Sequence, residues 1–189
     1  LYLKMIEQAI AELKGEEWHE EINPEINVNI SAYLPSDYIS DTDVRLNLYR
    51  KLSSLTEEPD LESMTVEVDD RFGPFPEEVS NLMRVMSIRL FLKQLRVTRL
   101  DVTEDGLLFT FAPDATLNPE KLLRMVNKEP KKFQFISDRK FRVRFVRLTP
   151  FQGLVEARKI IEVLATMKTS GPESRGEANP GIPARHRSS

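Results

Sequence analysis

The N-terminal half of the chain places its apolar residues mainly at helical spacing. Apolar positions three and four residues apart recur in residues 1–13, 42–55, 60–72 and 76–95, and this spacing gathers them on one face of a helix. In residues 26–34 apolar and polar residues instead alternate, which predicts a strand buried on one face. The longest helix should supply the centre of the core. Its predicted core residues are Val79, Leu82, Met83, Met86, Leu90, Phe91 and Leu92.

The C-terminal half changes from the helical period to the strand period. Two pairs of alternating segments are each separated by a short polar turn, at Asp105 and Gly106 in the first pair and at Asp138 and Arg139 in the second. Each pair predicts a β-hairpin. The sequence therefore predicts a single-domain α+β fold, with helices packed on a small, mostly antiparallel sheet. The predicted elements are strands 97–103 and 107–111, helix 119–127, strands 133–137 and 141–145, and helix 150–168.

The pattern divides the chain into three parts. Residues 1–25 contain the first helix and an acidic connector, and residues 26–168 contain the α+β domain. Residues 169–189 have closely spaced Gly and Pro and few apolar residues. Such a segment cannot bury enough apolar surface to fold, so we expect a disordered tail.

Composition excludes several classes of protein. The 189 residues are 40% hydrophobic and 30% charged, which is enough to bury a core. No stretch approaches the roughly 18 to 20 apolar residues of a membrane-spanning helix, and the first residues show no charged n-region followed by an apolar h-region. We therefore expect a soluble intracellular protein that does not contact a membrane. Cysteine is absent, which excludes disulfides, thiolate zinc sites and a cysteine nucleophile.

No stretch has the features of a catalytic or cofactor-binding site. The glycines before the tail lie far apart in the sequence, whereas a phosphate-binding loop needs several close together. The two histidines, His19 and His186, lie in the acidic connector and in the tail, where neither is held as an acid–base catalyst would be. The sequence therefore predicts no metal, no cofactor and no enzymatic activity in this fragment, and a small enzyme is the third and weakest interpretation.

Charge is distributed unevenly along the chain, although the net charge is only −3. Residues 1–80 carry 6 Lys or Arg and 19 Asp or Glu, whereas residues 121–147 carry 10 basic and 2 acidic residues. Such asymmetry can steer a charged partner. It can equally be neutralised within the fold or by solvent.

The basic segment 121–147 raises the question of nucleic-acid binding. In its hairpin Arg142 and Arg144 alternate with Phe141, Val143 and Phe145, so the arginines share one face and the apolar side chains share the other. We expect the aromatic rings to enter the core rather than to stack on bases. Contact with backbone phosphates remains an alternative function for the segment. Its candidate contact residues are Lys131, Lys132, Arg142 and Arg144.

Residues 65–76, TVEVDDRFGPFP, end one predicted helix and begin the next. Glu67 and Asp70 are three residues apart and so project from one helical face, and Arg71 follows Glu67 at the favourable spacing of four. Gly73 should adopt the left-handed conformation after the first helix, and Pro76 should occupy the first turn of the second. The carboxylates are interpreted either as a solvated face paired with Arg71 or as a docking surface.

The flanks of this motif resemble one family. In order along the chain, ISAYLPSDYI, DVRLNLYRKL and TVEVDDRFGPFPEEVSNLM are similar to the C-terminal domain of the bacterial transcription-repair coupling factor. The opening LYLKMIEQAIAELKGEE resembles the helix that leaves the motor of that family. The resemblance covers roughly residues 1–168, and its specificity lies in the ordered combination of segments.

The resemblance implies a regulatory part of a larger, cytoplasmic, ATP-dependent DNA translocase. In that family a helicase-like motor, which uses ATP and Mg²⁺, lies upstream and removes stalled RNA polymerase from damaged DNA. The C-terminal domain has no catalytic residues of its own. It docks on an N-terminal module and masks the site at which that module binds the damage-recognition ATPase of nucleotide excision repair.

The resemblance also implies roles for individual residues. The family has an E-x-x-D-R-F-G element whose acidic residues face arginines of the N-terminal module. Here these positions are Glu67 and Asp70, and Arg71 belongs to the same docking element. Phe72, Gly73 and Pro76 are then structural residues of the motif.

Overall fold

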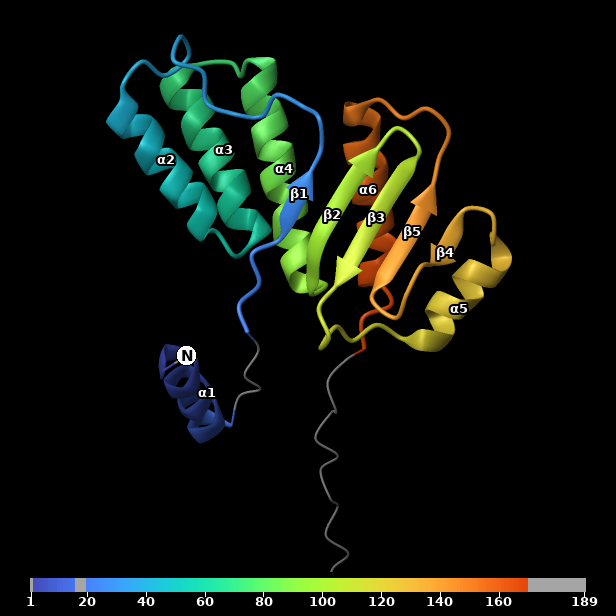
Figure 1. Ribbon diagram of the computed structural model, residues 1–189. Coiled ribbons are helices and arrows are strands. Elements are labelled where there is room, and N and C mark those ends of the chain that lie inside the picture. The colour runs from blue at the N-terminus through green and yellow to red at the C-terminus, as the bar shows by residue number, and fades with distance from the viewer. Residues whose placement is uncertain (1, 16–19, 170–189) are drawn as a thin grey trace, which may run out of the picture.

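The computed structural model describes residues 2–15 and 20–169, and the predicted α+β fold is confirmed (Figure 1). Residues 170–189 of the predicted tail and residues 16–19 of the acidic connector lie outside the described residues. The helices are α1 (Tyr2–Lys14), α2 (Thr42–Ser54), α3 (Glu58–Phe72), α4 (Glu77–Gln94), α5 (Pro119–Lys128) and α6 (Pro150–Ala165). The strands are β1 (Glu25–Asn27), β2 (Val97–Thr103), β3 (Gly106–Phe111), β4 (Phe133–Phe135) and β5 (Lys140–Arg144).

The five described strands form one sheet in the order β1-β2-β3-β5-β4. β1 is parallel to β2, and the other neighbours are antiparallel. Both predicted hairpins are confirmed, because β2 pairs with β3 and β4 pairs with β5. The position of the first turn needs correction, because Thr103 lies opposite Gly106 and the turn therefore consists of Glu104 and Asp105 rather than of Asp105 and Gly106.

The predicted strand 26–34 is wrong over most of its length, because only Glu25–Asn27 pairs with the sheet. From Val28 onward the chain crosses from the sheet to the helices, and its backbone groups find partners there. The side chain of the buried Asn81 in α4, for example, donates to the carbonyl of Ser31 at 3.0 Å. Burial still alternates from residue to residue along the crossing, although no strand pairs with it. The alternation in the sequence alone therefore could not show that these residues lie outside the sheet.

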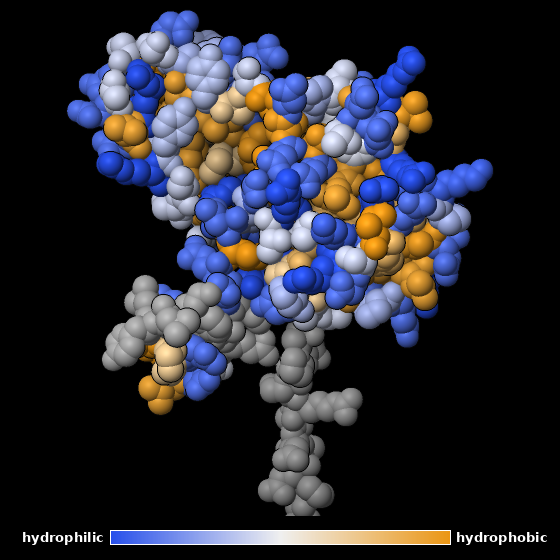
Figure 2. All heavy atoms as spheres, in the orientation of Figure 1, coloured by the Kyte–Doolittle hydropathy of each residue, from blue (hydrophilic) through white to orange (hydrophobic). Residues whose placement is uncertain are grey.

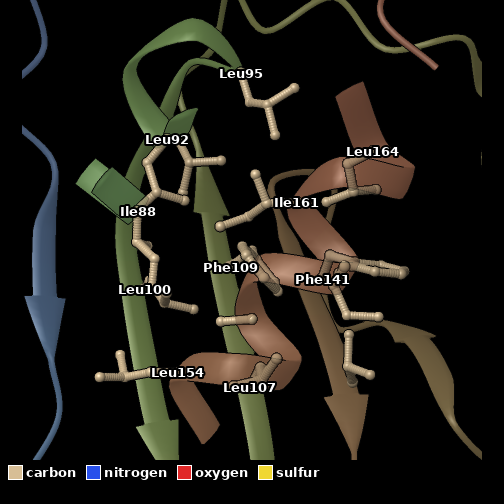
Figure 3. Packing of buried hydrophobic residues seen from close by; sticks show 14 of the residues in the cluster. Ile88, Leu92, Leu95, Leu100, Leu107, Phe109, Phe141, Leu154, Ile161 and Leu164 are labelled. Carbon is tan, nitrogen blue, oxygen red and sulfur yellow. The ribbon is translucent and has the colours of Figure 1, made fainter. Parts of the chain in front are cut away.

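Buried apolar side chains form two cores, and α4 contributes to both. The sheet core consists of Ile88, Leu92, Leu95, Val97, Leu100, Leu107, Phe109, Phe133, Phe141, Val143, Leu154, Ala157, Ile160, Ile161, Leu164 and Met167. The helical core consists of Leu34, Ile39, Leu48, Leu52, Leu61, Met64, Val68, Val79, Leu82, Met83 and Leu90. Figure 3 shows part of the sheet core, where Ile88 and Leu92 of α4 point toward Phe109 and toward Ile161 of α6.

The prediction that α4 lies at the centre is therefore confirmed for most of its residues. Met86 and Phe91, however, are only partly buried. Arg158 of α6 also joins the helices, because its guanidinium donates to the carboxylate of Glu58 in α3 at 3.0 Å and to the hydroxyl of Ser87 in α4 at 2.7 Å. Among the described helices, none is long and apolar enough to cross a membrane.

Candidate functional site

The acidic motif lies near the C-terminal end of α3. The buried side of this helix carries Leu61, Met64 and Val68, whereas Glu67 and Asp70 are exposed. Within the described part of the chain neither carboxylate forms a salt bridge. No salt bridge joins Arg71 to Glu67 either, and the guanidinium of Arg71 instead lies 4.8 Å from the ring centroid of Phe72. Both carboxylates are therefore free to contact a partner.

The carboxylates belong to a larger acidic surface that surrounds an apolar side chain. Val66 is 60% exposed on α3, and neighbouring turns of the helix bring acidic residues beside it. We call this surface the acidic face of α3; it consists of Glu62, Val66, Glu67, Asp69 and Asp70, all exposed. The sequence analysis found Glu67 and Asp70 but missed Val66, which the helical period would have placed on this face.

Tyr38 fixes the turn that follows the motif. Its ring lies edge-on to Phe72 and Phe75, at centroid distances of 6.1 and 6.3 Å, and its hydroxyl donates to the carbonyl of Gly73 at 2.8 Å. Burial, and after it the negative charge of Asp69, raises the pKa of Tyr38, so the hydroxyl keeps its proton. Sequence reasoning missed this residue, which lies outside any periodic segment.

The two predicted conformations in this turn need correction. Gly73 has a positive φ of 89° as expected, but its ψ of −174° is extended rather than left-handed helical. Pro76 is the N-cap of α4 rather than a residue of its first turn. The backbone N–H of Gly73 still closes α3 by donating to the carbonyl of Asp69 at 2.8 Å.

Replacing Tyr38 with Phe should lower the free energy of unfolding by about 0.5 to 1.5 kcal/mol, because the carbonyl of Gly73 loses its partly buried donor while the ring contacts remain. Chemical denaturation of Tyr38→Phe checks this value. Tyr33→Phe is the matched control, since Tyr33 is 47% exposed and should change stability by less than about 0.5 kcal/mol. Equal stability of Tyr38→Phe and the unchanged protein would show that the hydrogen bond does not hold the turn.

The basic residues predicted for nucleic-acid contact lie together on the other side of the molecule. Helices α4 and α6 pack on one face of the sheet (Figure 1), and no described element covers the opposite face. A groove of about 970 Å³ on this open face is lined by Lys131, Lys132, Arg142 and Arg144, together with apolar Leu108, Phe145 and Val146. We call it the basic groove. Figure 2 shows hydrophilic and apolar residues side by side on this side of the molecule.

The orientation of the second hairpin is confirmed in part. Phe141 and Val143 are buried in the sheet core, while Arg142 and Arg144 face the open side. Phe145 packs against the sheet core as expected, but this residue follows the end of β5 and is only partly buried, and it also lines the basic groove.

The β1–β2 half of the open face is electrically balanced. Arg99 contacts Asp101 at 3.0 Å and Glu25 at 3.5 Å, and the side chain of Asn27 donates to Asp101 at 2.9 Å. The hydrogen bond from Arg99 is the main cause that lowers the pKa of Asp101, and the bond from Asn27 adds to it. The charged side chains in this half of the face therefore neutralise one another.

The described residues hold no group of three or more side chains suited to bind a metal ion. The two histidines, His19 and His186, lie outside the described residues. The predicted functional residues thus gather on two surfaces, the acidic face of α3 and the basic groove.

Comparison with known proteins identifies the family. The family model of the TRCF domain matches residues 28–122, which include the whole acidic face of α3. The chain belongs to the TRCF family. The match ends before Lys131, so the basic residues of the groove lie outside it.

Curated TRCF relatives carry the name transcription-repair-coupling factor. The chain is 31% identical to the protein from Haemophilus influenzae over 162 residues, which cover 77% of this chain and 14% of the relative. It is 35% identical to the protein from Rickettsia typhi over 130 residues, which cover 68% of this chain and 12% of the relative. The chain therefore spans only a small part of the length of these relatives.

A solved structure shows the same fold. The crystal structure of a C-terminal domain of transcription-repair coupling factor superimposes with a TM-score of 0.63 at 18% identity, and the match covers 79% of this chain and 99% of that domain. This TRCF chain is therefore similar in fold to a separate C-terminal domain.

Proposed function

We propose that this chain is a non-catalytic, autoinhibitory domain of a transcription-repair coupling factor. The acidic face of α3 docks on the N-terminal module of the same protein and masks the site at which that module binds the damage-recognition ATPase of excision repair. The observation that carries the proposal is the exposure of Glu67 and Asp70 without a salt bridge among the described residues. Free carboxylates on one helical face suit a partner surface with arginines.

The energetics of such a contact suit a switch. Exposed ion pairs contribute only about 0.2 to 1 kcal/mol each, so few of them make an interface that can open. Tethering within one chain raises the effective concentration of the partner to about the millimolar range. A modest polar interface around the exposed Val66 therefore holds in the resting state and releases when a competing partner binds.

The activity of the whole protein is part of the proposal. The full-length coupling factor would be a cytoplasmic bacterial translocase whose upstream motor binds ATP and Mg²⁺, acts on DNA and releases RNA polymerase. The domain that residues 20–169 form would regulate that motor and the recruitment of repair proteins, and would not itself catalyse a reaction. Its membership of the TRCF family supports this assignment.

Reversing both carboxylates in the full-length protein should open the contact. Glu67→Lys with Asp70→Lys sets like charges against the arginines of the partner, and loss of two pairs worth about 0.2 to 1 kcal/mol each shifts the equilibrium by roughly two- to thirty-fold. A pull-down with the damage-recognition ATPase measures the expected rise in binding.

The control is the double reversal Glu129→Lys with Asp138→Lys, which makes the same change of charge at exposed residues far along the chain. It should leave recruitment unchanged, and thermal melts should show that both variants fold. If recruitment does not rise in a folded Glu67→Lys, Asp70→Lys protein, the carboxylates are only a solvated helix face.

A further inference from the structure

We propose that the basic groove on the open face of the sheet binds single-stranded nucleic acid, through its phosphate backbone and one or two stacked bases. The site is distinct from the acidic face of α3 and does not depend on the docking function proposed for it. It is formed by Lys131, Lys132, Arg142 and Arg144 with Leu108, Phe145 and Val146.

The charges of the groove are uncompensated. Among the described residues none of the four lysines and arginines forms a salt bridge, although Asp101 and Asp105 also line the groove. Asp101 is already held by Arg99 and Asn27, so it does not neutralise the arginines of β5. Asp105 remains as one carboxylate against four cations, so the open face has one balanced half and one half in which most of the positive charge lacks counter-charge. An anionic ligand supplies that charge and releases its own counterions when it binds.

The spacing of the cations suits an extended chain of phosphates. Arg142 and Arg144 are two residues apart on β5 and face the same side, so their Cα atoms are roughly 7 Å apart. Lys132 lies beside them, because the backbone N–H of Arg144 donates to its carbonyl at 2.8 Å. Lys131 precedes it and is exposed. The two arginines therefore follow the direction of β5 and Lys132 lies across from Arg144, which gives a cluster of cations that neighbouring phosphates of one strand can contact.

The apolar residues in the groove distinguish a single strand from a duplex. Val146 is 88% exposed, and the partly buried ring of Phe145 lines the groove with the ammonium of Lys132 at 5.3 Å from its centroid. A duplex presents mainly phosphates and keeps its bases stacked inside, so it cannot use these side chains. A single strand offers exposed bases that stack on an aromatic ring beside a cation. An acidic peptide would satisfy the charges but leave the ring without a stacking partner.

Fluorescence anisotropy of the 189-residue chain with a labelled oligothymidylate of about 12 nucleotides tests the proposal. We expect saturable binding that weakens roughly 50-fold between 50 and 200 mM salt, because about four phosphates are neutralised on a single strand. A duplex of the same length should bind several-fold more weakly. Polyglutamate of the same length should compete poorly.

Arg142→Glu with Arg144→Glu should weaken binding at 50 mM salt at least tenfold. Arg124→Glu with Lys128→Glu is the matched control, since these exposed residues of α5 belong to the same basic segment but do not line the groove. It makes the same change of charge and should weaken binding no more than about threefold. Lys131→Glu with Val146→Glu changes groove residues outside the strands, so it tests the site even if the β5 variant fails to fold.

Three results would overturn the proposal. The first is the absence of saturable binding at 50 mM salt. The second is an equal loss of affinity in the groove variants and in the α5 control, which would show only a general charge effect. The third is binding of the duplex, or competition by polyglutamate, that is as strong as binding of the single strand.

Discussion

Replacing Phe109 with alanine should lower the free energy of unfolding by about 3 to 5 kcal/mol, the usual cost of removing a large aromatic side chain from a core. Phe109 is fully buried in β3, between β2 and β5. The neighbouring strands are held by their ladders and cannot close the cavity that the ring leaves. Urea denaturation followed by circular dichroism measures the loss.

We also expect one unfolding transition rather than two in the Phe109→Ala protein. Ile88 and Leu90 lie two residues apart on α4, yet Ile88 belongs to the sheet core and Leu90 to the helical core. Loss of one core therefore removes the support of the other. The control is Phe135→Ala, because Phe135 belongs to the same sheet but is 44% exposed. Separate transitions would show that the two cores are independent, whereas a similar loss for both variants would show that burial of the ring does not set the cost.

Gly106→Ala should destabilise the protein by roughly 2 to 6 kcal/mol, the sum of backbone strain and overpacking. The φ of Gly106 is +146°, a conformation that residues with a Cβ rarely adopt. A Cβ at this position would also overlap the carbonyl oxygen of Val143 on the neighbouring strand. Because that oxygen belongs to a paired backbone, it cannot move without breaking the ladder.

Gly73→Ala separates these two causes. Gly73 also has a positive φ, of +89°, but a Cβ there would meet no atom within 4 Å. Its replacement should therefore cost only the strain, about 1 to 3 kcal/mol. Comparing the thermal melts of the two variants gives the contribution of the overlap. Equal destabilisation would mean that β3 and β5 separate to accommodate the new methyl group.

Much of the secondary structure could be predicted because its signals are local. The hairpin β2–β3 follows from alternating segments around a short polar turn, and α6 follows from the helical spacing of Leu154, Ala157, Ile161 and Leu164, all of which are buried. The crossing after Asn27 could not be predicted, because its alternation of burial is the same as that of a strand. What differs is the partner of the backbone groups, and that partner lies 50 residues away in Asn81.

The candidate sites were predictable to a similar extent. Glu67 and Asp70 share a helical face by spacing alone, and the structure places both on the surface. Tyr38 was missed because its contacts with Phe72 and Gly73 join segments about 35 residues apart. Alternation correctly placed Phe145 against the sheet core, but it could not show that this residue, which follows the end of β5, is only partly buried and also lines the basic groove.

The sequence by itself determined the fold class, the positions of most helices and both hairpins, and the separation of an acidic from a basic segment. These features depend on residues close together in the chain, whose spacing fixes the face on which each side chain lies. Only the tertiary structure decided that α4 joins two cores and that Asp101 is held by Arg99. It also decided that, among the described residues, no element covers one face of the sheet and the arginines of the groove form no salt bridge. Burial and charge pairing are set by contacts between distant segments, which periodicity does not encode.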